Sequence, residues 1–191
     1  MNQYVKDFTI RPFGPEDING HLAAVAASRP QLAAALSWAS PAYGPNESAA
    51  WVMSRTAAWA QASEYSFVVE HAPTRTFAGS CSINRIDWPH QVGNLTYWID
   101  SRWTGRGAAT AGAMLAARFA FANLGLRRVE ILAAEDNAAS IRVAEKLGAV
   151  REGVLRQRLR LGGARKDAVL LSILPRELNE PAVERRPMGT A

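Results

Sequence analysis

Two closely spaced glycines in front of a predicted helix form the part of the sequence best suited to bind an anion. Gly105 and Gly107 lie between an apolar run that ends at Ile99 and an alanine-rich stretch that begins at Ala108. Glycine lets the backbone turn sharply and approach a ligand closely. The first N–H groups of a helix have no partner within it, and the helix dipole favours negative charge there. The segment therefore predicts a pyrophosphate site that needs no metal.

Two arginines beside the glycines add to this prediction. Arg102 and Arg106 can donate charge-assisted hydrogen bonds to phosphate oxygens. The glycines are also compatible with a tight turn that does no more than open a helix. On this fragment alone, the two interpretations are equally well supported.

Two other nucleotide-binding motifs fit this segment less well. A phosphate-binding Walker loop requires Lys followed by Ser or Thr, where this sequence has Ala108 and Ala109. A dinucleotide-binding fingerprint requires Gly or Ala at the position of Thr110, directly after a strand. Glu130 does lie at the distance expected for the acidic residue of that fingerprint, so spacing alone does not exclude it.

Three consecutive segments of the sequence resemble one known family. They are Arg102-x-x-Gly105-x-Gly107 after a strand ending in Tyr97-Trp98-Ile99-Asp100, the stretch from Glu135-Asp136-Asn137 through Ser140 to Lys146-Leu147-Gly148, and Glu152-Gly153-Val154-Leu155-Arg156. In this order and spacing they are similar to the RimJ/RimL-like branch, the ribosomal-protein N-terminal acetyltransferase-like branch, of the GNAT superfamily. The resemblance is closest over residues 93–174 and extends more loosely back to residue 8.

The resemblance implies a fold and an activity. The fold would be a single GNAT-like domain over residues 1–178, of the α/β (α+β) class, with a mixed, mostly antiparallel central sheet and helices on both faces. Residues 179–191 would form a flexible tail. The activity would be transfer of an acetyl group from acetyl-CoA, a co-substrate used without a metal, directly onto a primary amine. The expected acceptor is the α-amine of a protein or peptide N-terminus.

The family pattern also implies which residues contact the cofactor. In this family, the strand before the glycine loop splays from its neighbour, and the pantetheine arm of CoA lies between the two strands. The cofactor-binding residues expected here are Trp98, Ile99, Asp100, Arg102, Gly105, Arg106, Gly107, Ala108, Ala109, Asn137 and Ser140. Asn137 would hydrogen-bond the pantetheine arm. Ser140 would be the catalytic residue that protonates the departing thiolate, and a thiol pKa of about 8.5 means that modest help suffices.

Several of these residues also have purely structural interpretations. Tyr97 and Trp98 fit ordinary core packing. Asn137 fits a helix N-cap, a role compatible with ligand binding. Ser140 could face solvent in the first helical turn, and Lys146 fits a solvated helix face better than a phosphate contact.

Three residues are expected near the acceptor amine. Trp38 is similar to a tryptophan near the acceptor pocket of the family. Asn94 stands where RimL-like enzymes are expected to carry a glutamate that acts as a base through water, and an amide cannot accept a proton at neutral pH. Asp87 could substitute, although a surface turn is its simpler interpretation.

The missing glutamate favours an α-amino acceptor over a lysine. A peptide α-amine with a pKa near 8 is already roughly one tenth neutral at pH 7, whereas a lysine amine with a pKa of about 10.4 needs far more help. Three alternatives stay open: a small-molecule amine acceptor such as an antibiotic, polyamine or amino acid; an acyl-CoA-binding regulator without turnover; and a nucleotide-binding module. The branch often dimerises, so a homodimer is also open.

Composition limits the class of protein. The chain has 191 residues, enough for one domain with a sizeable core, and a formal net charge of +5. Its apolar stretches are shorter than a membrane span, and its first residues lack a secretory pattern. The single cysteine, Cys81, fits a reducing cytoplasm. Nucleic-acid binding is not expected, because Arg156, Arg158 and Arg160 alternate as one solvated face of a strand without interleaved aromatic residues.

Other chemistry-bearing residue types form no recognisable site. His21, His71 and His90 lack the spacing of metal ligands, so no metal is expected. Cys81 lies in a strand pattern and fits a buried thiol better than a nucleophile. The sequence contains no Gly-x-Ser-x-Gly segment.

The elements that would position the site follow from apolar periodicity and turn residues. In the second half, the predictions are strand 93–99, helix 108–124, strand 129–133, a helix capped by Asn137 and ended by Gly148, and strands 150–161 and 168–174 joined at Gly162-Gly163. In the first half, they are an edge strand 8–12, a helix starting at Glu16-Asp17 and running through Val25, a helix capped within 46–48, and strands 65–69 and 77–86.

Overall fold

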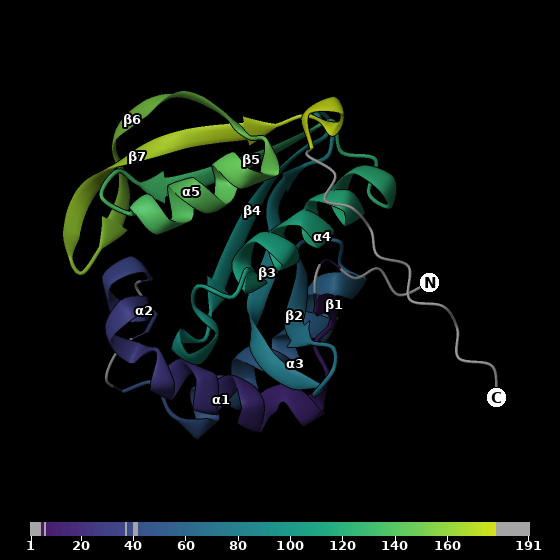
Figure 1. Cartoon of the computed structure of the whole chain (residues 1–191), viewed down its shortest axis with the longest axis vertical. Helices are drawn as coiled ribbons and strands as arrows, with labels where there is room; N and C mark the ends of the chain where they lie inside the picture. Colours follow the sequence, from purple (N-terminus) through teal and green to yellow (C-terminus); the bar gives the residue numbers. More distant parts are fainter. Residues whose placement is uncertain (1–4, 6, 37, 40–41, 179–191) are drawn as a thin grey trace.

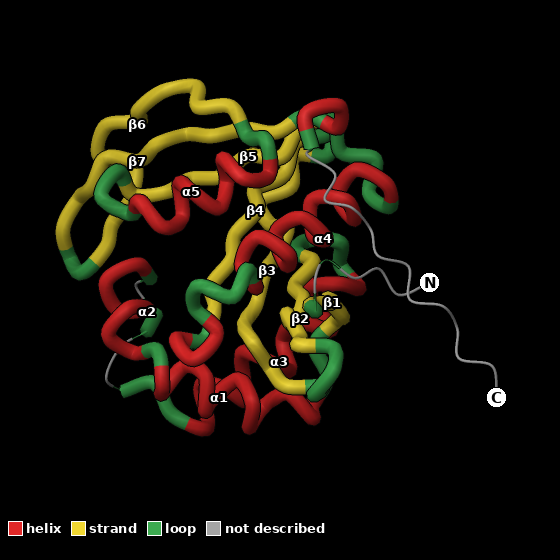
Figure 2. The backbone as a smooth tube through the Cα atoms, viewed as in Figure 1, coloured by secondary structure: helices red, strands yellow, loops and turns green. Residues whose placement is uncertain are grey.

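One mixed sheet organises the chain, as Figures 1 and 2 show for the computed structural model, which describes residues 5, 7–36, 38–39 and 42–178. Its strands are β1 (Phe8–Pro12), β2 (Tyr65–His71), β3 (Thr76–Asp87), β4 (Val92–Ile99), β5 (Arg128–Ala134), β6 (Val150–Leu161) and β7 (Ala164–Ile173), in the spatial order β1-β2-β3-β4-β5-β7-β6. Among the strands that the structure describes, only β4 and β5 pair in parallel. The predicted mixed, mostly antiparallel sheet is confirmed, whereas the predicted tail 179–191 lies outside the described residues.

Helices cover both faces of the sheet, as predicted. They are α1 (Ile18–Ala27), α2 (Arg29–Ala35), α3 (Pro45–Ala60), α4 (Ala108–Ala122) and α5 (Ala138–Leu147), with single 3-10 turns at Pro15–Asp17, Ser101–Trp103 and Pro175–Glu177. Neighbouring residues of β2 point their side chains into opposite helical layers. Val69 packs in the main core with α4, while Val68 packs on the other face with Val52 of α3.

Three helix predictions need correction. Helix α2 was not predicted. Proline breaks a helix in its interior, but Pro30 lies in the first turn, where a helix needs no N–H from that residue. Helix α3 begins at Pro45, with the N–H of Gly44 donating to Glu47 at 2.9 Å, and not within 46–48. Helix α4 ends at Ala122 and not at Leu124.

The alanine-rich sequence of α4 lets this helix lie close to the sheet. A Cβ on Gly112 would come within 2.5 Å of the Val69 side chain, so no larger residue fits there without a shift. The helix packs on β1 to β4, and α5 continues the layer over β5 and β7. This layer buries one continuous core, which includes Leu95, Ile131 and Leu171 of β4, β5 and β7. The core fixes where β4, β5 and α5 stand relative to one another.

The hairpin of β6 and β7 contains a bulge that the sequence did not predict. Leu155 pairs with Ala168 and Leu159 with Lys166, so three residues of β6 lie opposite Asp167 alone. Gln157 at the centre of this bulge has φ 55°, and its N–H donates to Asp167 Oδ1 at 2.8 Å. Arg156, Arg158 and Arg160 are all exposed, as predicted for a solvated strand face. The irregularity adds two residues to β6, an even number, so it interrupts the ladder without exchanging the two faces of the strand.

Candidate active site

Strands β4 and β5 open into a wedge. They pair only from Val92 to Asn94 on β4 and from Arg128 to Glu130 on β5. Beyond that point, the described residues of β4 pair with β3 alone, and those of β5 with β7 alone. Facing backbone groups on the two strands are thereby left available to a ligand, since unpaired backbone groups need partners. The splayed strands expected from the resemblance are present.

The glycine loop stands at the open end of the wedge. Gly105 and Gly107 have φ values of 78° and 86°, a backbone region that favours glycine. Gly107 is the N-cap of α4, and its carbonyl accepts the first helical hydrogen bond, from the Ala111 N–H at 2.9 Å. The N–H groups of the preceding helical residues, including Ala108 and Ala109, have no such partner within the helix. The geometry suits a pyrophosphate.

Arg102 is engaged by a buried carboxylate. Its Nε lies 3.0 and 2.9 Å from the two oxygens of Asp100, and its Nη2 pairs with the same group. Asp100 is fully buried, whereas the Arg102 side chain is 59% exposed. The ion pair therefore holds Arg102 at the start of the loop, and the guanidinium is not wholly free for phosphate.

Two further predictions about the loop are modified by the structure. The backbone of Asp100 was expected to face the cofactor, but its N–H donates to Ala78 at 3.0 Å and its carbonyl accepts from Trp103 at 2.8 Å. Asp100 thus positions the loop and has no free backbone group. Arg106 lies over the Trp103 ring, 5.2 Å from its centroid, so its charge is held beside the glycines.

Asn137 and Ser140 meet at the start of α5. Asn137 is the N-cap, and its Oδ1 accepts from the Ser140 N–H at 3.0 Å. Ser140 Oγ does not simply face solvent: it donates to the hydroxyl of Tyr97 at 3.3 Å, and that hydroxyl donates to the Ser140 carbonyl at 2.8 Å. Tyr97 lies on β4, so these bonds join the two sides of the wedge.

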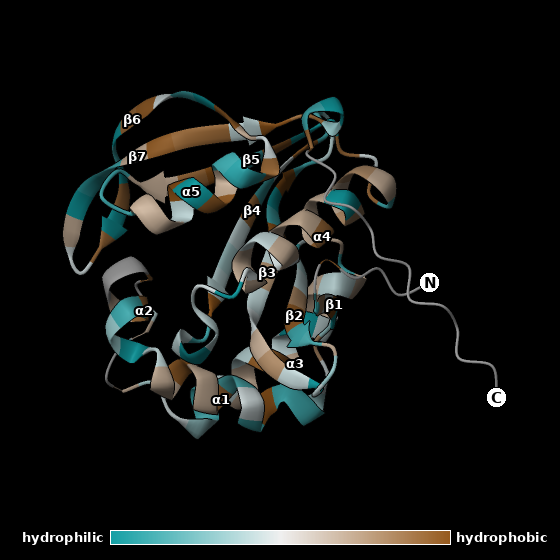
Figure 3. Cartoon of the chain, in the orientation of Figure 1, coloured by the Kyte–Doolittle hydropathy of each residue, from teal (hydrophilic) through white to brown (hydrophobic). Residues whose placement is uncertain are grey.

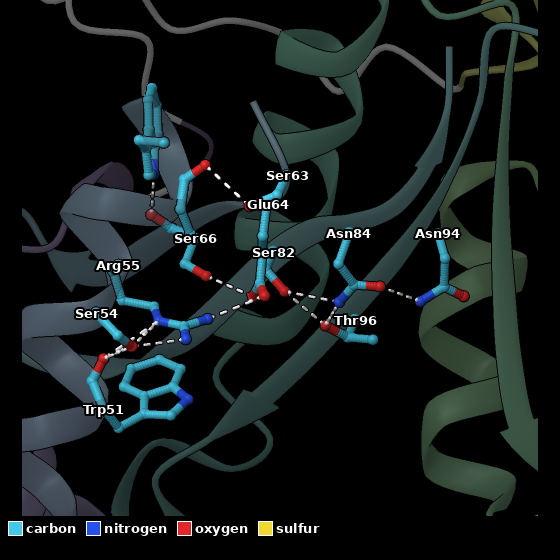
Figure 4. Close-up of polar contacts among 12 residues, drawn as sticks. Trp51, Ser54, Arg55, Ser63, Glu64, Ser66, Ser82, Asn84, Asn94 and Thr96 are labelled. Atoms are coloured by element: carbon cyan, nitrogen blue, oxygen red, sulfur yellow. Dashed lines mark hydrogen bonds and ion pairs between the residues drawn. The ribbon is translucent and has the colours of Figure 1, made fainter. Parts of the chain in front are cut away.

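The opposite face of β4 carries Asn94, Thr96 and Trp98, which alternate with the core-facing Leu95 and Tyr97. Figure 4 shows the amide side chains of Asn94 and Asn84 pointing toward one another from neighbouring strands, and Asn94 Nδ2 donates to Asn84 Oδ1 at 2.8 Å. The residue Asn94 is 8% exposed, and its Oδ1 has no partner among the described residues. A buried oxygen without a partner can accept a hydrogen bond from a substrate amine or a water.

The side chains of Ser82, Asn84, Asn94 and Thr96 form a polar floor on this face of β3 and β4, and none of them is a carboxylate. Asn84 Nδ2 donates to Ser82 Oγ and Thr96 Oγ1 at 3.1 and 3.2 Å, and those two hydroxyls are 2.8 Å apart. Thr96 is exposed, so the floor opens to solvent there. Uncharged oxygens thus line the place where the resemblance leads one to expect a glutamate.

Aromatic side chains flank the polar floor. The rings of Trp38 and Trp98 lie 6.3 Å apart at 65°, and Trp98 also packs edge-on to His21 at 5.7 Å. The structure therefore brings Trp38, from a segment far away in the sequence, to the same face of β4 as Asn94. These rings can enclose the first side chain of an acceptor.

Asp87 is not brought to this floor. It ends β3, its side chain is 51% exposed, and both of its oxygens lie within 3.0 Å of His90 Nδ1 in the following turn. The hydrogen bond from His90 lowers the pKa of Asp87 below its usual value, so the group stays ionised in a surface turn. No hydrogen bond links it to Asn94 in the described part of the chain.

The remaining reactive groups lie outside the wedge. Cys81 is buried beside α4, donates to the Gly112 carbonyl at 3.4 Å, and has its pKa raised by burial, as expected for an inert thiol.

Across the described residues, no three His, Cys, Asp or Glu side chains converge as metal ligands. In the same residues, no helix is long and apolar enough to cross a membrane.

Tyr97, Asn84 and Thr96 are site residues that the sequence reasoning did not assign. Strand alternation carries a signal for two of them, since Thr96 shares a face with Asn94 and Trp98 while Tyr97 faces the other way. The pairing of Asn84 with Asn94 depends on strand register, which local sequence does not specify.

A splayed parallel strand pair, a glycine loop and a helix N-terminus together form a site for a ligand that has an extended arm and a pyrophosphate. The chain belongs to the GNAT acetyltransferase family: the model of the Acetyltransferase (GNAT) domain matches residues 7–150.

Individual relatives agree with this assignment. The chain is 34% identical over 102 residues to the "Putative ribosomal N-acetyltransferase YdaF" of Bacillus subtilis, a match that covers 53% of this chain and 56% of that relative. The matched part thus spans little more than half of the relative's length. Among solved structures, the ribosomal-protein-S5-alanine acetyltransferase from Vibrio fischeri superposes with a TM-score of 0.82 at 21% identity, covering 94% of this chain and 100% of the other. Mycobacterium smegmatis RimJ in complex with CoA-disulfide gives a TM-score of 0.83 at 22% identity, covering 91% and 84%. At these identities, the two likenesses show the shared fold.

Proposed function

We propose that this protein is an N-acetyltransferase that moves the acetyl group of acetyl-CoA directly onto the α-amine of a protein or peptide N-terminus. One observation carries the proposal. The wedge between β4 and β5 separates a polar, aromatic-flanked face, with Asn94 and Trp98, from a pair of hydroxyls on the other side, Tyr97 and Ser140. The acceptor amine can thus approach the acetyl carbon from one face of β4, and the thiolate can leave toward the other face.

The chain's own residues fit a bound CoA. Gly105, Gly107 and the start of α4 would hold the pyrophosphate, and no atom lies within 4 Å of a Cβ built on Gly105. Backbone groups of Trp98 and Ile99 would pair with the pantetheine arm. Asn137 would contact the same arm while it caps α5. Bound acetyl-CoA supplies the thioester on which the reaction depends.

The reaction is a direct displacement. The neutral acceptor nitrogen forms a bond to the acetyl carbon, the carbon–sulfur bond breaks, and the nitrogen passes one proton to solvent water. The Ser140 hydroxyl turns from Tyr97 to the sulfur, donates its proton there and recovers one from solvent. Alignment of the amine by the floor of β4 supplies much of the rate, and backbone N–H groups in the wedge polarise the carbonyl.

The absence of a carboxylate at Asn94 supports an α-amine as acceptor. An amide oxygen orients the amine without removing its proton. An α-amine, with its lower pKa, is partly neutral at pH 7, whereas a lysine side chain is almost wholly charged. The names of YdaF and of the Vibrio fischeri enzyme, which refer to ribosomal substrates, agree with a protein acceptor. Location in the cytoplasm is part of the same proposal.

The test is thiol release from acetyl-CoA with three acceptor sets: peptides with a free N-terminus, the same peptides blocked at the N-terminus, and small amines. We expect release with free peptides only, and a fall in kcat of about 100-fold in Ser140→Ala, the range for loss of a positioned proton donor. Ser63→Ala, which removes an exposed hydroxyl at the end of α3, is the matched control and should keep full activity.

Two other outcomes would replace the proposal. Release with small amines alone would assign the protein to small-molecule acetylation. Tight CoA binding without release in any set would make it an acyl-CoA-binding regulator.

A further inference from the structure

The outer half of the β6–β7 hairpin is strongly basic. Arg156, Arg158, Arg160 and Arg165 are exposed within residues 156–167, which we call the hairpin arm. None of the four has a carboxylate within 4 Å in the described part of the chain. Figure 3 colours this end of β6 and β7 largely hydrophilic. The four guanidinium groups therefore face solvent without an ion-pair partner in the described part of the chain, and Asp167 is the one carboxylate within the arm.

Two of these arginines oppose each other. Arg160 and Arg165 are directly paired across the strands, and like charges in that position destabilise a hairpin. The bulge at Gln157 keeps Arg156 and Arg158 on the same arm, around a shallow hollow of about 560 Å³ that is also lined by Val154, Leu155, Gln157 and Asp167. A bound anion would offset this repulsion.

The arm projects from the mouth of the wedge. Ala134, the last residue of β5, pairs with Ala168 at the base of the arm, and the Glu135 N–H donates to the Asp167 carbonyl at 3.2 Å. Lys166 pairs with Asp136, the residue before Asn137. Arg165 lies three residue steps along β7 from Ala168, roughly 10 Å at 3.3 Å per residue. A peptide leaving the wedge along the arm would cover that distance in about three residues.

We propose that the hairpin arm binds acidic side chains of the acceptor, so that the substrate class is N-terminal segments carrying Asp or Glu from about the third to the sixth residue. This inference rests on the proposed function, because it assumes that a peptide amine enters the wedge. Arginine suits the partner, since its planar guanidinium matches a carboxylate with two parallel hydrogen bonds.

The composition of the hairpin favours an acidic peptide over RNA. No Phe, Tyr or Trp occurs between Val150 and Ile173. Modules that bind single-stranded RNA stack its bases on aromatic side chains. The hairpin offers positive charge but no aromatic surface on which bases could stack. It therefore suits an extended acidic peptide better than RNA.

The experiment uses the full chain and three peptides with the same first two residues, followed by four residues that are acidic, neutral amide or lysine. We expect kcat/KM for the acidic peptide to exceed that for the neutral one by about tenfold at low salt, and the ratio to shrink as salt screens the arginines. In Arg160→Glu/Arg165→Glu, the preference should disappear or reverse to favour the lysine peptide.

A matched double variant controls for net charge. Arg127 and Arg176 are exposed arginines near the other end of β5 and β7, so Arg127→Glu/Arg176→Glu makes the same change in charge away from the arm. It should keep the preference for acidic peptides. Loss of that preference in both variants would overturn the proposal, because the effect would then come from overall charge.

The remaining outcomes separate this inference from the proposed function. Equal turnover of all three peptides would leave the function standing and overturn the role of the arm. An increase in KM for acetyl-CoA alone in Arg160→Glu/Arg165→Glu would also overturn it, since the arginines would then serve the cofactor phosphates. If no peptide turns over, fluorescence anisotropy decides: arm-dependent binding of the acidic peptide supports the inference, and tighter arm-dependent binding of an RNA oligonucleotide overturns it.

Discussion

The hydroxyl of Tyr97 on β4 makes two hydrogen bonds to Ser140 on α5. It donates to the Ser140 carbonyl at 2.8 Å and accepts from Ser140 Oγ at 3.3 Å. Burial raises the pKa of Tyr97 to about 12, so the phenol is neutral and keeps its proton. The two residues thereby tie together the elements on either side of the wedge and orient the Ser140 hydroxyl before any ligand binds.

Removal of the Tyr97 hydroxyl should impair proton donation more than cofactor binding. In Tyr97→Phe we expect kcat to fall about tenfold, with KM for acetyl-CoA nearly unchanged, because Ser140 loses its orienting partner. The free energy of unfolding should fall by about 1 kcal/mol, since the Ser140 carbonyl loses a hydrogen bond. Steady-state kinetics and urea unfolding measure both. Tyr65→Phe, at the half-buried first residue of β2, is the control, and an equal loss of kcat there would contradict the role of Tyr97.

Substitution of Gly107 should separate backbone strain from ligand binding. An alanine at φ 86° costs about 1–2 kcal/mol of stability in the left-handed region. In Gly107→Ala we also expect CoA to bind about tenfold more weakly, a loss of about 1.4 kcal/mol, because the cap that aims the α4 N–H groups shifts. Gly125→Ala imposes similar strain at φ 70°, with no atom within 4 Å of the new Cβ. Thermal melts and isothermal titration should show that only the first variant loses CoA affinity.

The pH dependence of the rate should follow the acceptor and not the protein. Because Asn94 cannot accept a proton, kcat/KM should fall about tenfold per pH unit below the pKa of the peptide amine, near 8. Two peptides whose α-amine pKa values differ by about one unit should give midpoints that differ by the same amount. A midpoint that stays fixed for both peptides would indicate a titrating base in the protein.

His21 should make stability depend on pH. The side chain is fully buried, stacked on Trp51 at 4.7 Å, and burial lowers its pKa from 6.5 to about 4. Between these two pH values the unfolded state therefore binds more protons than the folded state. The contribution of neutral His21 to the free energy of unfolding is fully present above about pH 6.5 and is lost as the pH drops toward 4. Between pH 7 and 5 we expect a loss of about 2 kcal/mol, a range above the titration of most carboxylates.

Urea unfolding at several pH values measures this slope. His21→Gln should flatten it, whereas His90→Gln, in the exposed turn after β3, should leave it in place. An unchanged slope in His21→Gln would assign the effect to another group.

The local sequence by itself determined most elements of the second half of the chain. Glycines at 105, 107, 148, 162 and 163 all adopt positive φ, because these turns need a conformation that other residues avoid. Asn137 caps α5 through its own side chain, an interaction between residues three apart. Apolar periodicity placed α4 and the strands around it for the same reason: each signal lies within a few residues of the structure that it specifies.

The tertiary structure decided which of these residues meet. The opening between β4 and β5, the bond from Tyr97 to Ser140 and the pairing of Asn84 with Asn94 join residues 10 to 43 positions apart, and they depend on strand register and helix packing. The engagement of Arg102 by Asp100 depends on the burial of that carboxylate, which two neighbouring residues cannot specify alone. The bulge at Gln157 likewise depends on Asp167 across the hairpin. Contacts of this kind reflect the sum of many weak packing preferences, so local sequence carries the elements of the site but not their arrangement.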